Sequence, residues 1–106
     1  MIQRHTEIKI GDNIYKASFN FGVIKGIQNS IKGIKVDQIF KGVQEENFDI
    51  IIELLYHSIK FNHKDFTRRQ IESLGMSDIE NVFTGIAELF ELSLPTVKEN
   101  DEEEKN

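Results

Sequence analysis

The chain contains no cysteine, so it can form neither a disulfide nor a thiolate site for zinc or an iron–sulfur cluster. No apolar run approaches the ~20 residues that a membrane-spanning helix needs. The first ten residues, MIQRHTEIKI, include no apolar segment of the kind found in signal peptides. We therefore expect a cytoplasmic protein that does not enter a membrane.

Positive charge is in short supply. The chain has 18 acidic and 13 basic residues, which gives a formal net charge of -5. A nucleic-acid binder or an electrostatic membrane binder needs a basic surface, so we expect neither partner. Basic or mixed-charge proteins remain suitable partners. With 106 residues, 39% of them hydrophobic, the chain is long enough for one domain.

The N-terminal region shows the alternation of a β-hairpin. Residues 6–10 (TEIKI) and 14–19 (IYKASF) alternate around the turn cluster Gly11-Asp12-Asn13. In an alternative reading, residues 1–5 are loose and the hairpin is shorter. The side expected to be buried consists of Ile8, Ile10, Tyr15, Ala17 and Phe19.

From Phe21 the apolar spacing changes to that of helices. The first helix should end near Gly33. Gly22 and Gly26 weaken it by about 1 kcal/mol each, or else they allow close packing on the hairpin. A second, short helix should start at residues 36–37 with Asp37 as its N-cap, and Asn47 can cap the helix that follows it.

Two capping boxes, residues 67–70 and 77–80, predict a short helix and then a longer one that Pro95 ends. Residues 95–106 have an acidic run and one valine, which predicts a disordered tail. The expected fold is α+β: a hairpin followed by about five helices on a central apolar helix, forming one domain over 1–94. The last helix should bury a stripe made of Ile79, Val82, Phe83, Ile86, Leu89 and Phe90.

Residues 48–61, FDIIIELLYHSIKF, are apolar almost all round a helix and define that central element. One face carries Phe48, Ile51, Ile52, Leu55 and Ile59, and a second carries Ile50, Leu54, Phe61 and partly His57. Leaving these three apolar residues of the second face in water would forfeit about 1.5–3 kcal/mol each. That loss rivals the ~5–15 kcal/mol stability of a small domain. Either the rest of the domain or a partner molecule must cover this face.

Signals for chemistry are weak. His5, His57 and His63 include no pair at helical metal spacing, and we find no phosphate loop and no nucleophile elbow. The basic residues at 64, 68 and 69 are typical of a solvated helix start, although an acidic partner is conceivable there. We expect no catalytic residues, no metal, no cofactor and no enzyme activity.

The order of elements, with Phe19-Asn20-Phe21-Gly22 entering the first helix and Tyr56-His57 in the central one, resembles the tail assembly chaperones of long-tailed bacteriophages of Gram-positive hosts. The resemblance covers about residues 6–92; residues 62–66 form a longer and more aromatic segment than it leads us to expect. It implies a protein that binds the tape measure protein, keeps it soluble and helps to recruit tail tube protein. Such a chaperone works in the host cytoplasm and is absent from the mature virion.

With this resemblance, we expect the second face of helix 48–61 to form a client-binding or self-association surface together with aromatic residues of the last helix. The alternative function is a small acidic phage-encoded regulator that binds and inhibits a host protein. The predicted partner-binding residues are Ile50, Leu54, His57, Phe61, Phe83 and Phe90.

Overall fold

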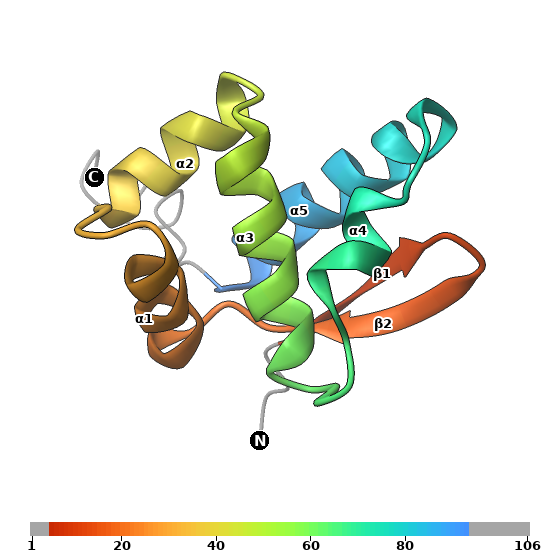
Figure 1. Cartoon of the computed structure of the whole chain (residues 1–106), viewed down its shortest axis with the longest axis horizontal. Helices are drawn as coiled ribbons and strands as arrows, with labels where there is room; N and C mark the ends of the chain where they lie inside the picture. The colour runs from red at the N-terminus through yellow and green to blue at the C-terminus, as the bar shows by residue number, and fades with distance from the viewer. Residues whose placement is uncertain (1–4, 94–106) are drawn as a thin grey trace, which may run out of the picture.

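The computed structural model of the chain describes residues 5–93, so the predicted tail at 95–106 lies outside the described part. An antiparallel hairpin precedes five helices, which confirms the predicted α+β fold (Figure 1). The elements are β1 (Thr6–Ile10), β2 (Asn13–Ala17), α1 (Phe21–Ser30), α2 (Val36–Gln44), α3 (Phe48–Lys60), α4 (Arg68–Glu72), the 3₁₀ turn η1 (Met76–Asp78) and α5 (Ile79–Ser93).

The hairpin has a two-residue loop, because Ile10 pairs with Asn13. Gly11 is the first loop residue and has φ +63°, which suits the glycine position of a type II′ turn. Side chains alternate along both strands as predicted, so that Ile8 and Ala17 are buried while Lys9 is exposed. Only one face of the ribbon therefore contributes to the core.

Helix α3 is the central element, and Figure 1 shows α1 and α2 on one side of it and α4 on the other. The side chain of Asn47 accepts from the backbone N–H groups of Asp49 and Ile50, which confirms its predicted role as N-cap. Strand β2 covers a further part of α3. A helix that is apolar all round is thus enclosed by four neighbours.

Two glycines let the neighbouring helices come close to α3. A Cβ atom at Gly26 of α1 would lie 2.6 Å from Nδ1 of His57, and one at Gly42 of α2 would collide with Ile50. Gly26 therefore allows close packing of α1 on α3 and not on the hairpin. The second apolar face of α3 is covered by the same chain over most of its length.

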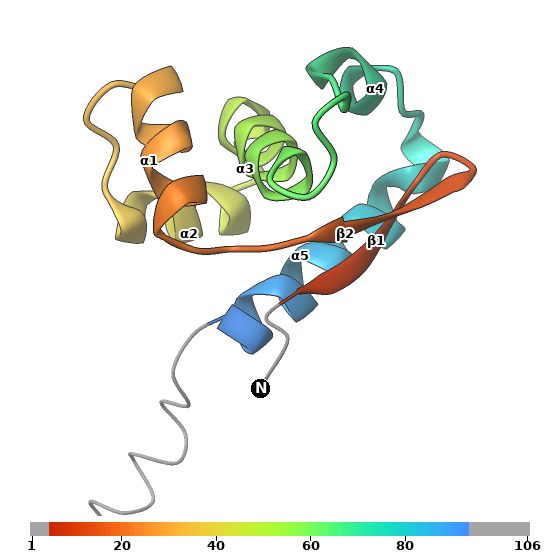
Figure 2. The same cartoon turned by 90° about the horizontal axis from the view of Figure 1, so that it is seen from below.

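Helix α5 runs along β1, and Figure 2 shows it beside the hairpin while α1, α3 and α4 lie above the hairpin in that view. Gly85 faces Ile8, whose Cγ1 would be 2.8 Å from an added Cβ. Val82, Ile86 and Leu89 are buried, as their spacing predicts, whereas Ile79, Phe83 and Phe90 of the predicted stripe are half-buried.

Two of the predicted caps are wrong. The N-cap of α2 is Lys35, whose N–H is bonded by the side chain of Gln38, and Asp37 is already inside the helix. Ser77 lies within η1, where Asp78 accepts from the N–H of Gly75 at 3.3 Å. In both cases the residue that follows the predicted cap, Gln38 or Asp78, accepts a hydrogen bond from the backbone N–H three residues before it.

The first capping box is present in part at α4. The side-chain oxygen of Gln70 accepts from the N–H of Thr67 at 3.0 Å and from its hydroxyl at 3.2 Å. The predicted start of this helix is thereby confirmed.

Candidate protein-binding groove

An open apolar groove of about 630 Å³ lies between α2 and α5. This volume is within the range of known ligand sites. Helix α2 contributes one wall because Phe40 and Val43 are one turn apart, and α5 contributes the other through residues spaced by three and four. The groove is lined by Phe40, Val43, Gln44, Glu46, Phe83, Ile86, Ala87 and Phe90.

Three phenyl rings give one side of the groove a fixed shape. Phe40 and Phe90 meet edge to face with centroids 4.6 Å apart, and Phe19 contacts Phe90 at 5.3 Å and Phe40 at 6.0 Å. Two aromatic rings in this geometry contribute more stability than the burial of their apolar surface alone provides. Phe19 is buried beneath the other two, which are half-buried. The apolar surface that remains open is therefore preformed.

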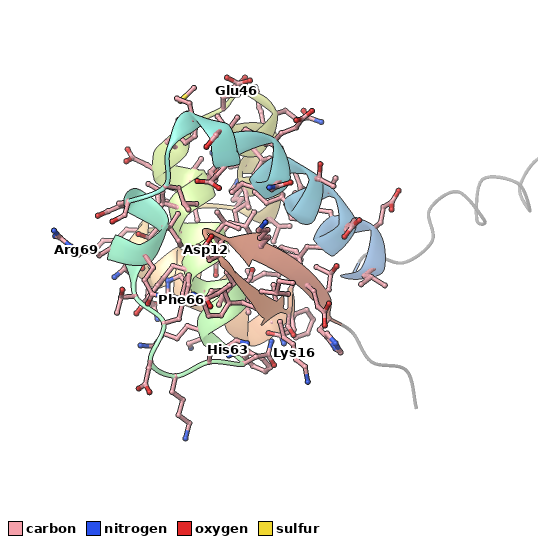
Figure 3. The ribbon with its side chains drawn as sticks, turned by 90° about the vertical axis from the view of Figure 1, so that its right-hand side faces the viewer. Asp12, Lys16, Glu46, His63, Phe66 and Arg69 are labelled. Atoms are coloured by element: carbon pink, nitrogen blue, oxygen red, sulfur yellow. The ribbon has the colours of Figure 1, made fainter. Side chains whose placement is uncertain are left out.

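The rim of the groove is acidic. Glu46 lines it from the turn between α2 and α3, where its backbone is left-handed with φ +60°. Figure 3 shows Glu46 at the opposite end of the molecule from Lys16 and His63. Glu80 and Glu91 of α5 are exposed and lie within one helical turn of the residues that line the groove. An apolar partner in this groove would meet negative charge at its edges.

Of the six predicted partner-binding residues, the structure places two in this groove: Phe83 and Phe90, both half-buried. The prediction is wrong for the exposure of Ile50 and Leu54, which are 8% and 0% exposed. They are covered because α1 and α2 approach α3 closely at glycine. Neither side chain can form an open binding surface in this conformation.

Phe61 is 58% exposed, as expected, but it lies away from the groove at the C-terminal end of α3. Its ring is next to Gly22, the neighbour of Phe21, which is 90% exposed. A smaller apolar hollow of about 200 Å³, with Phe48 and Met76 among its lining residues, lies between α3, α4 and the start of α5. The predicted residues therefore belong to separate regions instead of one surface.

His57 belongs to a polar cluster that joins three helices. Arg68 of α4 donates to both carboxylate oxygens of Glu53, at 2.7 and 3.0 Å, and its guanidinium lies 4.1 Å from the ring centre of Tyr56. Nε2 of His57 lies 3.3 Å from the Glu53 carboxylate and 3.1 Å from Oγ of Ser30 in α1. We call these five residues the Glu53 cluster.

The electrostatics of the Glu53 cluster follow from burial and from Arg68. Burial lowers the pKa of His57 below its ordinary 6.5, and the positive charge of Arg68 adds to this while Glu53 opposes it. Burial raises the pKa of Glu53, but the hydrogen bonds and charge of Arg68 outweigh that effect and hold the pKa below 4.5. The stable arrangement is a neutral His57 beside an ionised Glu53.

This cluster has the residue types of a Ser-His-acid triad but not its geometry. In a triad, serine and carboxylate bind opposite nitrogens of the imidazole. Here Ser30 and Glu53 both contact Nε2, while Nδ1 faces Gly26. Ser30 therefore has no base oriented by a carboxylate behind it. The cluster is suited to holding α1, α3 and α4 together.

No group of three or more potential metal-binding side chains comes together within residues 5–93. In the same range, none of the helices combines the length and the apolar character that crossing a membrane requires.

Six groove residues were not among those predicted to bind a partner: Phe40, Val43, Gln44, Glu46, Ile86 and Ala87. The sequence carried a partial signal, since Phe40 and Val43 share a stripe on α2 that the buried Ile39 and Gly42 do not occupy. No feature of the sequence pointed to Ala87, because alanine is common at both buried and exposed positions of helices.

Comparison of the chain with protein-family models, with curated proteins and with solved structures finds no match in any of the three.

Proposed function

We propose that this protein is a phage tail assembly chaperone, which binds an apolar helical segment of the tape measure protein in the α2–α5 groove. Bound there, the client stays soluble in the host cytoplasm until tail tube protein is recruited around it. The observation that carries this proposal is an open, preformed apolar groove between two helices of a small acidic domain.

The shape of the groove supports a helical client. Residues of two helices line the groove, and an amphipathic helix binds by laying its apolar stripe into a groove of this kind. Phe83 and Phe90 are the aromatic anchors that such an interface would use. Burial of apolar surface on both partners supplies the driving force, at about 25 cal/mol per Å².

The negative charge of the chain supports the same function. A client with a long apolar stripe aggregates when it is alone, and a bound chain with a formal net charge of -5 adds negative charge that makes the complexes repel one another. The order of elements over residues 6–92, which resembles that of tail assembly chaperones, is a second and independent support. Self-association, through Phe61 or elsewhere, stays a prediction.

Co-expression with a tape measure protein from the same genome tests the proposal. The informative variant is Ala87→Gln, because Ala87 lines the groove yet is exposed, so that a longer polar side chain blocks the groove without disturbing the core. We expect the wild-type chain to keep the tape measure protein soluble and to co-purify with it. Ala87→Gln should reduce the amount recovered at least tenfold.

The matched control is Thr84→Gln, which introduces the same side chain on an exposed position of α5 that does not line the groove. It should behave as wild type, and circular dichroism should be the same for all three chains. Equal recovery with Ala87→Gln would contradict the proposal. A regulator of a host protein, the alternative function, would leave the tape measure protein insoluble even with the wild-type chain.

A further inference from the structure

The apolar groove is bordered by carboxylates on both of its walls. Glu46 lines the groove itself. On α5, Glu80 precedes Phe83 by three residues and Glu91 follows Ala87 by four, so both lie one turn from the groove along the same stripe. A partner seated on the phenyl rings would place its own flanking side chains next to these three carboxylates.

Within residues 5–93, Glu46, Glu80 and Glu91 form no ion pair. In that range, Arg68 and the neutral His57 make their close contacts with the carboxylate of Glu53, and neither contact involves a residue of the groove. Lys41, next to Phe40 on α2, is a positive charge in the neighbourhood, and Asp37 in the first turn of the same helix offsets it. The rim therefore keeps a surplus of negative charge.

We infer that the groove selects an amphipathic helix whose apolar stripe is bordered by lysine or arginine. This inference rests on the proposed function, since it specifies the chemistry of the client segment. In a bound helix, residues one turn from the apolar stripe reach the edges of the groove, where lysine or arginine would pair with Glu46, Glu80 or Glu91. Aspartate or glutamate at those positions would be repelled.

The charge pattern also argues against the chain's own C-terminal segment as the occupant. Residues 101–104 read DEEE, which has the same sign as the rim. A basic-flanked helix of another protein matches both the apolar floor and the acidic edge, whereas this segment matches neither.

Two synthetic helical peptides with one apolar stripe in common, flanked by lysine in one and by glutamate in the other, test the inference. Fluorescence anisotropy with the full chain should give about tenfold tighter binding of the lysine peptide at low ionic strength. The preference should nearly vanish at about 1 M salt, where the Debye length is about 3 Å.

Charge reversal then identifies the carboxylates responsible. The triple variant Glu46→Lys, Glu80→Lys and Glu91→Lys should bind the glutamate peptide in preference to the lysine peptide. The control, Glu7→Lys, Asp65→Lys and Glu72→Lys, makes the same change in net charge at exposed positions outside the groove and should keep the wild-type preference.

The inference is wrong if the wild-type chain binds both peptides equally, or if the control triple loses the preference as fully as the rim triple. It is also wrong if sedimentation shows a wild-type dimer that the rim triple breaks, because a second copy would then occupy the groove. Capture of the tape measure protein without a peptide preference would contradict this inference alone. A peptide preference without that capture would contradict the proposed function alone.

Discussion

Ser58 lies on the buried part of α3 and shows what that burial costs a polar side chain. Its side chain is fully buried, and its hydroxyl has no hydrogen-bond partner among the residues that the structure describes. Ser18 is buried as well, but its hydroxyl accepts from the side-chain amide of Asn62 at 3.0 Å. A buried hydroxyl without a partner costs stability, whereas a bonded one contributes to it.

Ser58→Ala should therefore raise the free energy of unfolding by about 1 kcal/mol, since it removes an unsatisfied polar group and improves helix propensity. Ser18→Ala, the matched control, should lower it by about 0.5–1 kcal/mol, because Asn62 loses a partner. Urea unfolding at pH 7 measures both. A loss of stability in Ser58→Ala would mean that the hydroxyl is satisfied in solution.

At the same scale, residue patterns predicted some caps and missed others. Asn47 was predicted correctly because one side chain alone can reach the free N–H groups at the start of α3. Asp37 was wrong because Gln38 competes for the same task from three residues beyond Lys35. Sequence supplies several acceptors in a row, and only the backbone conformation decides which one is used.

At the scale of elements, the apolar pattern of α3 predicted that it is central but not what covers it. The periodicity shows that both faces of α3 are apolar. It does not show whether a neighbouring helix of the same chain or another molecule covers the second face. The deciding residues are Gly26 and Gly42, which let α1 and α2 reach the second face of α3. From the sequence alone, a glycine within a helix predicts a less stable helix. That it allows a neighbouring helix to pack closely is evident only when the side chain facing it is known.

The Glu53 cluster makes the packing of α1, α3 and α4 sensitive to pH. Because the pKa of His57 in the fold is below 6.5, the folded state binds its proton less readily than the unfolded state does. The stability that neutral His57 contributes is then fully present above pH 6.5. It is lost as the pH drops through the pKa that His57 has in the folded protein. Glu53, whose pKa is below 4.5, adds a further loss in more acidic solution.

His57→Gln should flatten the decrease in the free energy of unfolding between about pH 7 and pH 5, since glutamine does not titrate. Below that window, both chains should lose stability together as Glu53 is protonated. Chemical unfolding at each pH, with the neutral range as internal control, gives the comparison. Parallel curves for the two chains across the window would show that His57 does not cause the decrease.

For the whole molecule, the sequence predicted the small α+β fold that the structure shows, but only two of the six residues predicted to form one apolar surface lie in the groove. Phe83 and Phe90 were predicted both as members of the apolar stripe of α5 and as partner-binding residues, and they line the groove half-buried. Their partners on α2 could not be paired with them, because α2 and α5 are distant in sequence and only the fold brings them together. The sequence thus predicted an excess of apolar surface but not where on the molecule that surface lies.

The most direct test of the central claim is site-specific photo-crosslinking of the client to the groove. A benzophenone amino acid at position 87 lies in the groove, and the same group at position 14 lies on the solvent face of the hairpin, where Ile14 is 63% exposed. Position 48 reports on the smaller hollow beside α4. The account predicts a covalent adduct with the tape measure protein, or with the lysine-flanked peptide, from position 87 only. Adducts from position 14 or 48 with none from position 87 would contradict it.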